Sequence, residues 1–273
     1  MPTSVPDPER TLPAGRKARI ASLVSSVGEA TIPELAARFS VSVDTIRRDL
    51  DQLHAEGVVH RTRGGAIRSP DTPKPELSID ARRSAHIEEK ALIGEVAASL
   101  VHDGMSVMLN AGTTCLAVAR CLGDRRDLII ATNNLLLPAE LEHRAIRNVY
   151  LFGGEVRLSA QATIGPVRFD SSSAHGESSV LCDIAFITVG AASVDGGFST
   201  GSLSEATMMR EMIEHAQQVV LLVDGSKLGK RLFAQVCEFA RPDYLVTDRE
   251  PPADFLRAAH DQGVTVKFPA PLG

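Results

Sequence analysis

The spacing of apolar residues divides the chain into two parts that follow different patterns. Between residues 20 and 53, apolar residues recur three or four positions apart, which is the period of helices with one buried face. Beyond residue 105, short apolar runs alternate with helical stretches, which is typical of a mostly parallel sheet covered by helices. The pattern therefore predicts a small helical unit followed by a larger α/β unit.

Three helices are predicted in the first part. The second begins at Thr31, and Glu34 follows at the spacing of a capping box. Ser42 ends the turn before the third helix and is a suitable N-cap for it. The apolar faces of the three helices are formed by Ile20, Leu23, Val24 and Val27, then by Ile32, Leu35, Ala36 and Phe39, then by Val43, Ile46, Leu50 and Leu53.

The polar face of the third helix carries the residues expected to read DNA. Arg48 lies opposite the apolar stripe, between Asp44 and Thr45, and Arg47 lies at the edge of the polar side. Because arginine binds guanine in bidentate fashion or pairs with a phosphate, we predict a helix-turn-helix with this helix in the major groove. An ordinary amphipathic surface helix is the alternative. Asp44 also has a purely structural explanation, since the helix dipole favours an acid in the first turn.

A β-wing is predicted after the third helix. Residues 58–61 and 66–68 have the pattern of two short strands joined through Thr62–Gly65. A tip of arginine and glycine suits a contact with the DNA backbone or minor groove, whereas the alternative is a small solvated hairpin. The arginines on or near the wing are Arg61, Arg63 and Arg68.

Three short motifs in this part resemble the N-terminal domain of the DeoR family of bacterial transcription regulators. They are Thr45-Ile-Arg-Arg-Asp-Leu50, Glu56-Gly57 and Arg63-Gly-Gly-Ala66. The resemblance implies a winged helix-turn-helix that binds a double-stranded DNA operator. The residues expected at the DNA are Thr31, Ser42, Val43, Asp44, Thr45, Arg47, Arg48, Arg61, Arg63 and Gly64.

Proline-rich stretches and charge divide the chain in the same place. We expect a disordered arm over residues 1–12, a winged helix-turn-helix over 13–68, a linker over 69–76 and an effector-binding and oligomerisation domain over 77–273. Residues 1–69 hold ten basic and eight acidic residues, a charge of +2, whereas the rest hold nineteen and twenty-six, a charge of −7. A mildly basic head makes few phosphate contacts, so DNA binding is expected to need a dimer or a larger homo-oligomer.

The remaining composition excludes several classes of protein. The sequence contains four cysteines, Cys115, Cys121, Cys182 and Cys237, whose spacing predicts neither a metal site nor a disulfide framework. We expect them to be buried thiols in a reducing cytosol. The sequence carries no signal peptide and no apolar run that could span a membrane. We therefore expect a cytoplasmic protein with no membrane partner and no cofactor.

The second part is expected to form a Rossmann-like, mostly parallel sheet with helices. Residues 170–180 are polar and are expected to be flexible. Strands are predicted at 105–109, 128–131, 149–152, 184–189, 219–223, 244–246 and 264–268. Helices are predicted at 86–101, 135–144, 203–215 and 253–260, and one more follows the first strand and ends at 122.

Chemically informative residues follow several of these strands. Ligands of such sheets bind beyond the carboxyl ends of the strands. Gly112, Thr113 and Thr114 lead into a helix N-terminus, which suits a phosphate, and Lys227 could pair with a phosphate or a sugar oxygen. The residues expected around the ligand are Asn110, Gly112, Thr113, Thr114, Thr132, Asn133, Gly153, Gly154, Asp183, Glu205 and Lys227.

This part resembles the C-terminal effector domain of the DeoR family, which is similar to the fold of ribose-5-phosphate isomerase. The resemblance implies a phosphorylated sugar as effector, with Gly112–Thr114 at the phosphate and Asp183, Glu205 and Lys227 at the sugar. The chain departs from the family at Asn110, where an aspartate is usual, and at Cys115, where a third threonine is common. Residues 170–180 are also atypical.

The sequence thus predicts a transcriptional regulator, most simply a repressor of a carbohydrate-metabolism operon, that is not an enzyme. One alternative is a sugar-phosphate isomerase with an appended DNA-binding head. In it, Asp183 or Glu205 would be the base and Lys227 would stabilise an enediolate. A second alternative is a DNA-binding head on a dimerisation module that binds no small ligand.

Overall fold

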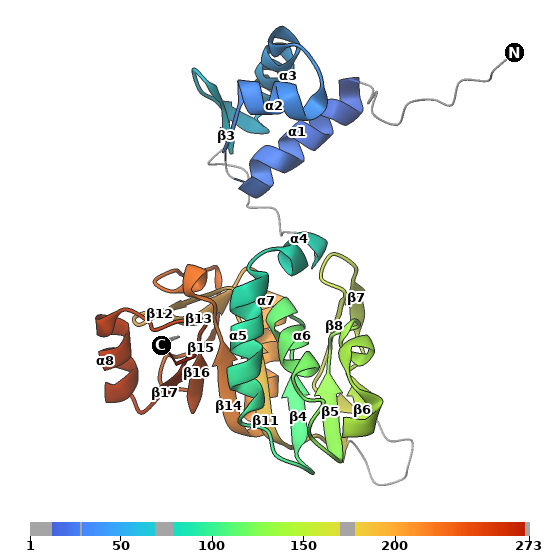
Figure 1. The fold of residues 1–273 in the computed structure, drawn as a ribbon, viewed down its shortest axis with the longest axis vertical. Coiled ribbons are helices and arrows are strands. Elements are labelled where there is room, and N and C mark those ends of the chain that lie inside the picture. The colour runs from blue at the N-terminus through green and yellow to red at the C-terminus, as the bar shows by residue number, and fades with distance from the viewer. Residues whose placement is uncertain (1–12, 28, 69–78, 170–177, 271–273) are drawn as a thin grey trace, which may run out of the picture. The chain divides into compact units, whose positions relative to one another are not determined.

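The computed structural model describes residues 13–27, 29–68, 79–169 and 178–270, and the chain forms two compact units, 1–77 and 78–273 (Figure 1). The arm predicted over 1–12 and the linker predicted over 69–76 lie outside the described residues, as do residues 170–177 of the polar stretch.

The first unit is a winged helix-turn-helix, as the sequence predicted. Its strands form an antiparallel sheet in the order β1-β3-β2, in which β1 was not foreseen because three residues are too few to establish an alternating pattern. A side chain at Gly65 would lie 2.1 Å from the carbonyl oxygen of Ala30, so only glycine lets β3 pair this closely with β1. The elements are α1 (Pro13–Val27), β1 (Glu29–Thr31), α2 (Ile32–Phe39), α3 (Val43–Ala55), β2 (Val59–Arg61) and β3 (Gly65–Arg68).

Side-chain caps fix where α2 and α3 begin. The Thr31 amide donates to a Glu34 carboxylate oxygen at 2.9 Å, and the Glu34 amide donates to the Thr31 hydroxyl at 3.4 Å, which completes the predicted capping box. The hydroxyl of Ser42 accepts from the Thr45 amide at 3.2 Å. Between the helices, Ser40 turns the chain in the left-handed conformation with φ of 52°.

The three helices enclose a core in which one predicted apolar position is replaced by an ion pair. Ile46 and Leu50 are fully buried, but Val43 is 40% exposed, so its place on the predicted stripe is wrong. Asp49 occupies the buried face instead, where it accepts from the Nε atom of Arg16 on α1 at 2.6 Å. This contact raises the pKa of Arg16 and ties α1 to α3.

The second unit is built on a parallel sheet. Among the described residues the main sheet has seven strands in the order β17-β16-β14-β11-β4-β5-β6. Its elements are α4 (Ile79–Ser84), α5 (Ile87–Ala98), β4 (Ser106–Leu109), α6 (Thr113–Arg120), β5 (Leu128–Thr132), β6 (Ile146–Leu151), β11 (Cys182–Thr188), α7 (Leu203–Glu214), β14 (Ala216–Leu222), β16 (Tyr244–Val246), α8 (Ala253–Asp261) and β17 (Thr265–Lys267). Shorter strands are β7 (Glu155–Arg157), β8 (Ala162–Ile164), β9 (Arg168–Phe169), β10 (Ser178–Ser179), β12 (Ala191–Ser193), β13 (Gly197–Thr200) and β15 (Ala234–Cys237).

Helices cover both faces of the sheet, with α5 and α6 on one face and α7 on the other (Figure 1). Side chains alternate between the faces along a strand: Val107 and Leu109 pack with α5 and α6, whereas Met108 packs with α7. The α/β fold predicted from the sequence is confirmed.

The helix predicted over 135–144 is wrong. The chain there forms two 3-10 turns, Leu137–Glu140 and His143–Ala145. The Leu136 amide is capped by Asn134, and the Leu135 amide donates to the carbonyl of Gln161. Pro138 has no amide proton to continue a ladder, and β6 starts at Ile146, so a full helix has neither the donors nor the length it needs.

Candidate nucleic-acid interface and effector site

The outward face of α3 carries the arginines predicted to reach DNA. Arg48 is exposed. Arg47 is exposed too, and its Nη1 atom lies 3.1 Å from an Asp44 carboxylate oxygen one turn earlier. A pair this exposed contributes little to stability, so Arg47 is free to exchange Asp44 for a phosphate.

Three other predicted DNA residues of the helix-turn-helix, Thr31, Ser42 and Thr45, are engaged at the caps. The Thr31 hydroxyl completes the capping box of α2, and the Ser42 and Thr45 hydroxyls lie 2.8 Å apart. Val43 projects from the first turn of α3 and is exposed. The caps fix the ends of the helices, and Arg48 and Val43 are left as outward-facing side chains.

Two arginines of the wing have different roles: Arg61 binds the wing to α3, and Arg63 lies at the exposed tip. The Nε atom of Arg61 donates to Asp51 on α3 at 2.8 Å, and its Nη1 atom donates to the carbonyls of Thr62 and Gly65. Arg61 therefore holds the wing against α3. Arg63 and Gly64 form the exposed tip, where the Gly64 carbonyl accepts from the Ile32 amide at 2.9 Å.

In the second unit, the order of the strands brings most of the predicted effector residues to one edge. The strands β14, β11, β4, β5 and β6 are neighbours and parallel, so the loops after them meet at their carboxyl ends. This edge collects Asn110, Gly112, Thr113, Thr114, Thr132, Asn133, Gly153, Gly154 and Lys227.

Asn110 is fully buried and ties β4 to β11. Its Nδ2 atom donates to the Thr188 carbonyl at 3.0 Å, and its Oδ1 atom accepts from the Thr188 amide at 2.8 Å. The Cys115 thiol also donates to that oxygen, and burial raises the pKa of this thiol to about 12. Asn110 is thus a structural tie, and Cys115 is an unreactive buried thiol.

Thr132 and Asn133 tie the next two loops together in the same way. The Thr132 hydroxyl donates to the Leu109 carbonyl at 2.6 Å. The side chain of Asn133 accepts from the Ala111 amide at 2.7 Å and donates to the Thr163 carbonyl at 2.8 Å. These predicted effector residues hold the loops in place with most of their hydrogen-bonding capacity.

The N-terminus of α6 is the part of this edge best suited to an anion. Its N-cap is Gly112, and no side chain caps the helix. A side chain at Gly112 would lie 2.1 Å from the Thr188 hydroxyl, so glycine is required there. Thr113 follows half-buried and Thr114 buried. Backbone amides at such a helix start bind phosphate well.

Glu205 lies in the first turn of α7, on the other side of this edge. Its carboxylate accepts from the Nη1 atom of Arg157 at 2.8 Å and from the Thr200 hydroxyl at 3.0 Å. Together with Asn110 and Asn133, Glu205 lines a small cavity of about 10 Å³, which Met208, Met209 and Met212 also line. Sequence reasoning missed Arg157, Thr200 and Thr188, because only the folded chain brings them next to predicted residues.

Lys227 follows β14 and is paired within its own loop. Its Nζ atom lies 3.2 Å from a carboxylate oxygen of Asp224, which is buried. Burial raises the pKa of Asp224, but Lys227 and the Ser226 hydroxyl outweigh burial and leave this pKa below its ordinary value. The loop is therefore a fixed, charged corner of the site.

Asp183 does not belong to this site, which corrects the sequence prediction. It is the second residue of β11 and accepts from the Ser106 amide at 2.7 Å and the Ser106 hydroxyl at 2.6 Å. Ser106 begins β4, so both residues lie at the amino ends of parallel strands, five positions before Thr188, or about 16 Å along the strand. The two bonds from Ser106 lower the pKa of Asp183.

Gly153 and Gly154 form the turn into β7. A side chain at Gly154, where φ is 132°, would lie 2.2 Å from the Ile164 carbonyl oxygen, and one at Gly165 would lie 2.5 Å from the Gly153 oxygen. Both glycines of this contact, Gly154 and Gly165, allow two stretches of backbone to touch. Their placement explains the glycine at 154 without a ligand, whereas a side chain at Gly153 would meet no atom within 4 Å.

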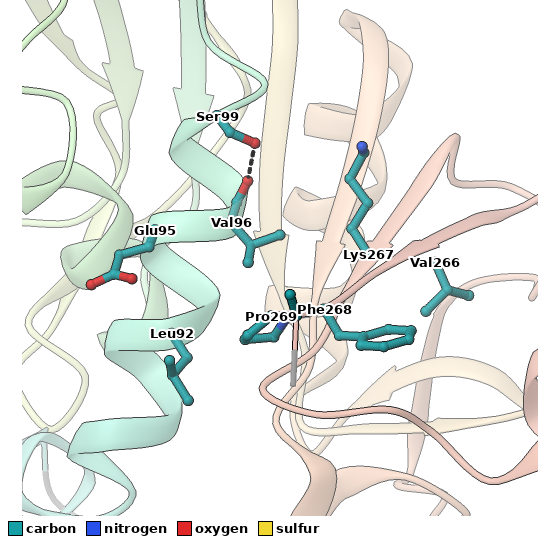
Figure 2. Close-up of a pocket in the computed structure, with 9 residues that line it drawn as sticks. Leu92, Glu95, Val96, Ser99, Val266, Lys267, Phe268 and Pro269 are labelled. Atoms are coloured by element: carbon teal, nitrogen blue, oxygen red, sulfur yellow. Dashed lines mark hydrogen bonds between the residues drawn. The ribbon is translucent and has the colours of Figure 1, made fainter. Parts of the chain in front are cut away.

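A larger hollow, of about 610 Å³, lies away from the predicted residues, between α5 and the end of β17 (Figure 2). Figure 2 shows Leu92, Glu95 and Val96 on the helix opposite Phe268 and Pro269. Lys267, on its rim, stacks over the Tyr244 ring at 5.6 Å. Because the hollow is open and holds no convergent set of cations, the sheet edge is the better candidate for a phosphorylated ligand.

The described residues hold neither a group of side chains that could bind a metal ion nor a helix that could span a membrane. Within those ranges no three histidine, cysteine, aspartate or glutamate side chains are grouped so that they could hold a metal ion. None of the helices described is both long and apolar enough to cross a membrane.

Both units match known families. Residues 16–72 match the DeoR-like helix-turn-helix domain, and residues 85–249 match the DeoR C terminal sensor domain. The second match alone spans more than half of the chain.

Curated relatives are similar over nearly their whole length. The HTH-type transcriptional regulator GlpR of Haloferax volcanii is 33% identical over 255 residues, which are 93% of this chain and 97% of that protein. The HTH-type transcriptional repressor GlcR of Bacillus subtilis is 34% identical over 234 residues, covering 86% and 88% of the two chains. The glycerol-3-phosphate regulon repressor of Escherichia coli is 30% identical over 252 residues, covering 91% and 96%.

Solved structures give weaker similarity. A ribose 5-phosphate isomerase from Methanocaldococcus jannaschii aligns with 51% of this chain and 53% of its own, at 22% identity and a TM-score of 0.35. The full-length sorbitol operon regulator SorC from Klebsiella pneumoniae aligns with 94% of this chain and 100% of its own, at 14% identity and a TM-score of 0.37.

Proposed function

The chain belongs to the DeoR family of transcriptional regulators, and from that premise we propose that it represses a carbohydrate-metabolism operon until a phosphorylated sugar binds its α/β unit. The observation that carries the proposal is one chain holding both an outward-facing arginine helix and an uncapped helix start at the edge of a parallel sheet. Relatives named as repressors, one of them for a glycerol-3-phosphate regulon, support the sign of regulation and the class of ligand.

At the operator, α3 lies in the major groove. Arg48 reads a base edge or grips a phosphate, Arg47 pairs with a phosphate, and Arg63 at the wing tip contacts the backbone or minor groove. Arg61 acts indirectly, because its bonds to Asp51 and to the wing carbonyls set the angle of the wing.

In the α/β unit, the phosphate of the sugar lies at the N-terminus of α6, against Gly112, Thr113 and Thr114. Lys227 lies on the same edge and attracts the anion, and Glu205, in the first turn of α7, accepts hydrogen bonds from sugar hydroxyls. The ligand must bind the DNA-incompetent arrangement more tightly. A hundredfold preference, about 2.7 kcal/mol, would shift a balanced equilibrium almost completely.

The regulator works as a homo-oligomer in the cytoplasm. Two heads are needed because each carries few basic residues and because helix-turn-helix proteins read paired half-sites. Strand β6 supports a contact between copies, since it is the edge strand of the sheet and Val149, Tyr150 and Leu151 along it are each more than 40% exposed.

The α/β unit has no isomerase activity. Asp183, one of two candidate bases, lies at the opposite end of the sheet, and Glu205, the other, is paired with Arg157. Turnover of ribose 5-phosphate or another sugar phosphate that disappears in Lys227→Ala would overturn this part of the proposal.

The test is binding of the full chain to DNA from just upstream of its own gene, with and without a panel of sugar phosphates. We expect a discrete protected site that one compound releases. If the protein binds this DNA and no compound releases it, the DNA-binding role stands and the effector site is refuted. That result is the one expected of a DNA-binding head on a dimerisation module that binds no small ligand. Failure to bind this DNA would refute local repression.

A further inference from the structure

Val43 is an apolar side chain on the face of the first unit that carries the DNA-binding arginines. It is 40% exposed, and among the residues of that unit that the structure describes it is the only exposed large hydrophobic side chain. It is also the first residue of α3, the helix proposed to enter the major groove. Single exposed apolar residues are common, so the case for a role rests on what surrounds Val43.

The structure gives Val43 no packing role. A helix start is often fixed by an apolar contact between the residue before the N-cap and the fourth residue of the helix. In α3 these residues are Val41, which packs against the core of the first unit, and Ile46, which belongs to that core. Val43 lies outside the core, and valine is a weaker helix former than alanine. Neither packing nor helix propensity therefore accounts for a valine at this position.

The polar side chains beside Val43 already have partners within the first unit. The Ser42 hydroxyl accepts from the Thr45 amide at 3.2 Å and lies 2.8 Å from the Thr45 hydroxyl. Asp44 pairs with Arg47 at 3.1 Å. Val43 takes part in none of these contacts, and side chains of a helix lean toward its N-terminal end. In a recognition helix that end is the one whose residues meet the base edges.

The chemistry of a valine limits what it recognises in the major groove. Adenine, guanine and cytosine present hydrogen-bond donors and acceptors there, whereas thymine adds an apolar group, the methyl group at C5. A valine has no donor or acceptor to offer, so it gains nothing from a polar base edge. Against a thymine methyl group, its two branches exclude water from apolar surface on both sides of the contact.

We propose that Val43 selects a thymine in each half-site of the operator by packing against the C5 methyl group of that base. The inference rests on the proposed binding of α3 in the major groove and deepens it, because it names a base that the helix selects. Arg47 and Arg48 supply the polar and phosphate contacts of the same helix, and Val43 adds a preference that depends on one methyl group.

The experiment removes the methyl group from the DNA and the side chain from the protein, separately and together. Within the protected upstream site, each thymine is replaced in turn by deoxyuridine, which lacks only the C5 methyl group. The unchanged full chain, Val43→Ala and Val156→Ala are titrated with each duplex by fluorescence anisotropy. Val156, on β7 in the second unit, is 49% exposed, so its variant loses the same atoms from another exposed valine.

We expect one thymine in each half-site at which deoxyuridine lowers the affinity of the unchanged chain about fourfold, the effect of burying one methyl group. At that position Val43→Ala should bind the thymine and deoxyuridine duplexes within about twofold of each other, because the two changes remove the same contact. Val156→Ala should keep the fourfold difference. Synthetic DNA contains no 5-methylcytosine, so a loss at deoxyuridine identifies thymine as the source of the methyl group.

Two further readouts separate base reading from a structural or electrostatic role of Val43. The melting temperature of Val43→Ala should equal that of the unchanged chain, because an exposed valine contributes little packing. The slope of operator affinity against salt concentration should also be the same, because Val43 neutralises no phosphate.

Three results would overturn the inference. If the unchanged chain binds the site and deoxyuridine has no effect at any position, Val43 reads no methyl group, and the proposed DNA binding still stands. A deoxyuridine effect that persists at full size in Val43→Ala would assign the contact to another residue. If the unchanged chain protects no site in this DNA, the proposed repression fails and the role of Val43 fails with it.

Discussion

The two units use their polar residues in opposite ways. On α3 the arginines face outward, and Arg47 pairs with Asp44, which is exposed as well. At the sheet edge of the α/β unit, the side chains of Asn110, Thr132 and Asn133 form hydrogen bonds with neighbouring segments of the chain. A surface for a large, flat partner is made by leaving side chains on a rigid helix. A pocket for a small ligand first needs loops fastened to one another, and most polar residues at the edge do that.

The largest effect is expected from a substitution that removes the hydrogen bonds between two of these loops. Asn133→Ala removes the acceptor of the part-buried Ala111 amide and the donor to the buried Thr163 carbonyl. Leaving these two groups without their partner should lower the free energy of unfolding by about 2–4 kcal/mol. Chemical denaturation measures this loss, and Asn148→Ala, on the exposed strand β6, is the matched control. Equal stability of the two variants would mean that Asn133 is not a tie.

Arg48→Ala should have the next largest effect, and it should act on operator binding instead of on stability. Operator binding is expected to weaken by about 1–3 kcal/mol while the free energy of unfolding stays the same, because Arg48 is exposed. Fluorescence anisotropy with labelled DNA gives the affinity. Arg38→Ala, an exposed arginine at the end of α2, is the control and should change binding less. A loss as large in the control would point to general charge rather than to the α3 face.

Asp183→Asn tests the position of Asp183 at the amino ends of the strands, away from the predicted effector site. Because two bonds from Ser106 depress the pKa of Asp183 in the folded state, its stabilising contribution is present above the ordinary value of 3.8 and is lost as the pH falls through the lower folded value. The wild type should therefore lose more stability than the variant as the pH falls from about 5 through 3.8 and below, with a difference of about 1 kcal/mol above that window.

The same variant should bind the effector with unchanged affinity, since Asp183 lies at the amino ends of the strands. Isothermal titration with the compound that releases the operator checks this. A drop in affinity comparable to that of Glu205→Gln would return Asp183 to the site.

The smallest effect is expected from the pair on α3. Asp44→Ala removes an exposed partner of Arg47 and should change the free energy of unfolding by no more than about 0.5 kcal/mol. Operator affinity should stay the same or rise, because Arg47 is released and a negative charge is removed from the DNA-facing side. Weaker operator binding would show instead that Asp44 itself contacts a base.

Sequence patterns went furthest where structure is local. The capping box at Thr31 and the N-cap at Ser42 were predicted correctly, because each joins residues three positions apart. The same holds for the strands of the main sheet, whose apolar runs are short and continuous. The 135–144 segment failed because a proline and a pairing with residue 161 override its apolar spacing.

By itself the sequence determined the winged helix-turn-helix, the parallel sheet and the loops that gather at its edge, because helix and strand periods and capping are set by neighbours along the chain. The tertiary structure alone decided that Asp183 lies at the far end, that Asn110 is a tie to Thr188, and that Arg61 braces the wing. It also left the Nε and Nη2 atoms of Arg82 buried without a hydrogen-bond partner. These outcomes depend on which distant residues meet and on how much water each contact excludes, and neither quantity is encoded in spacing along the chain.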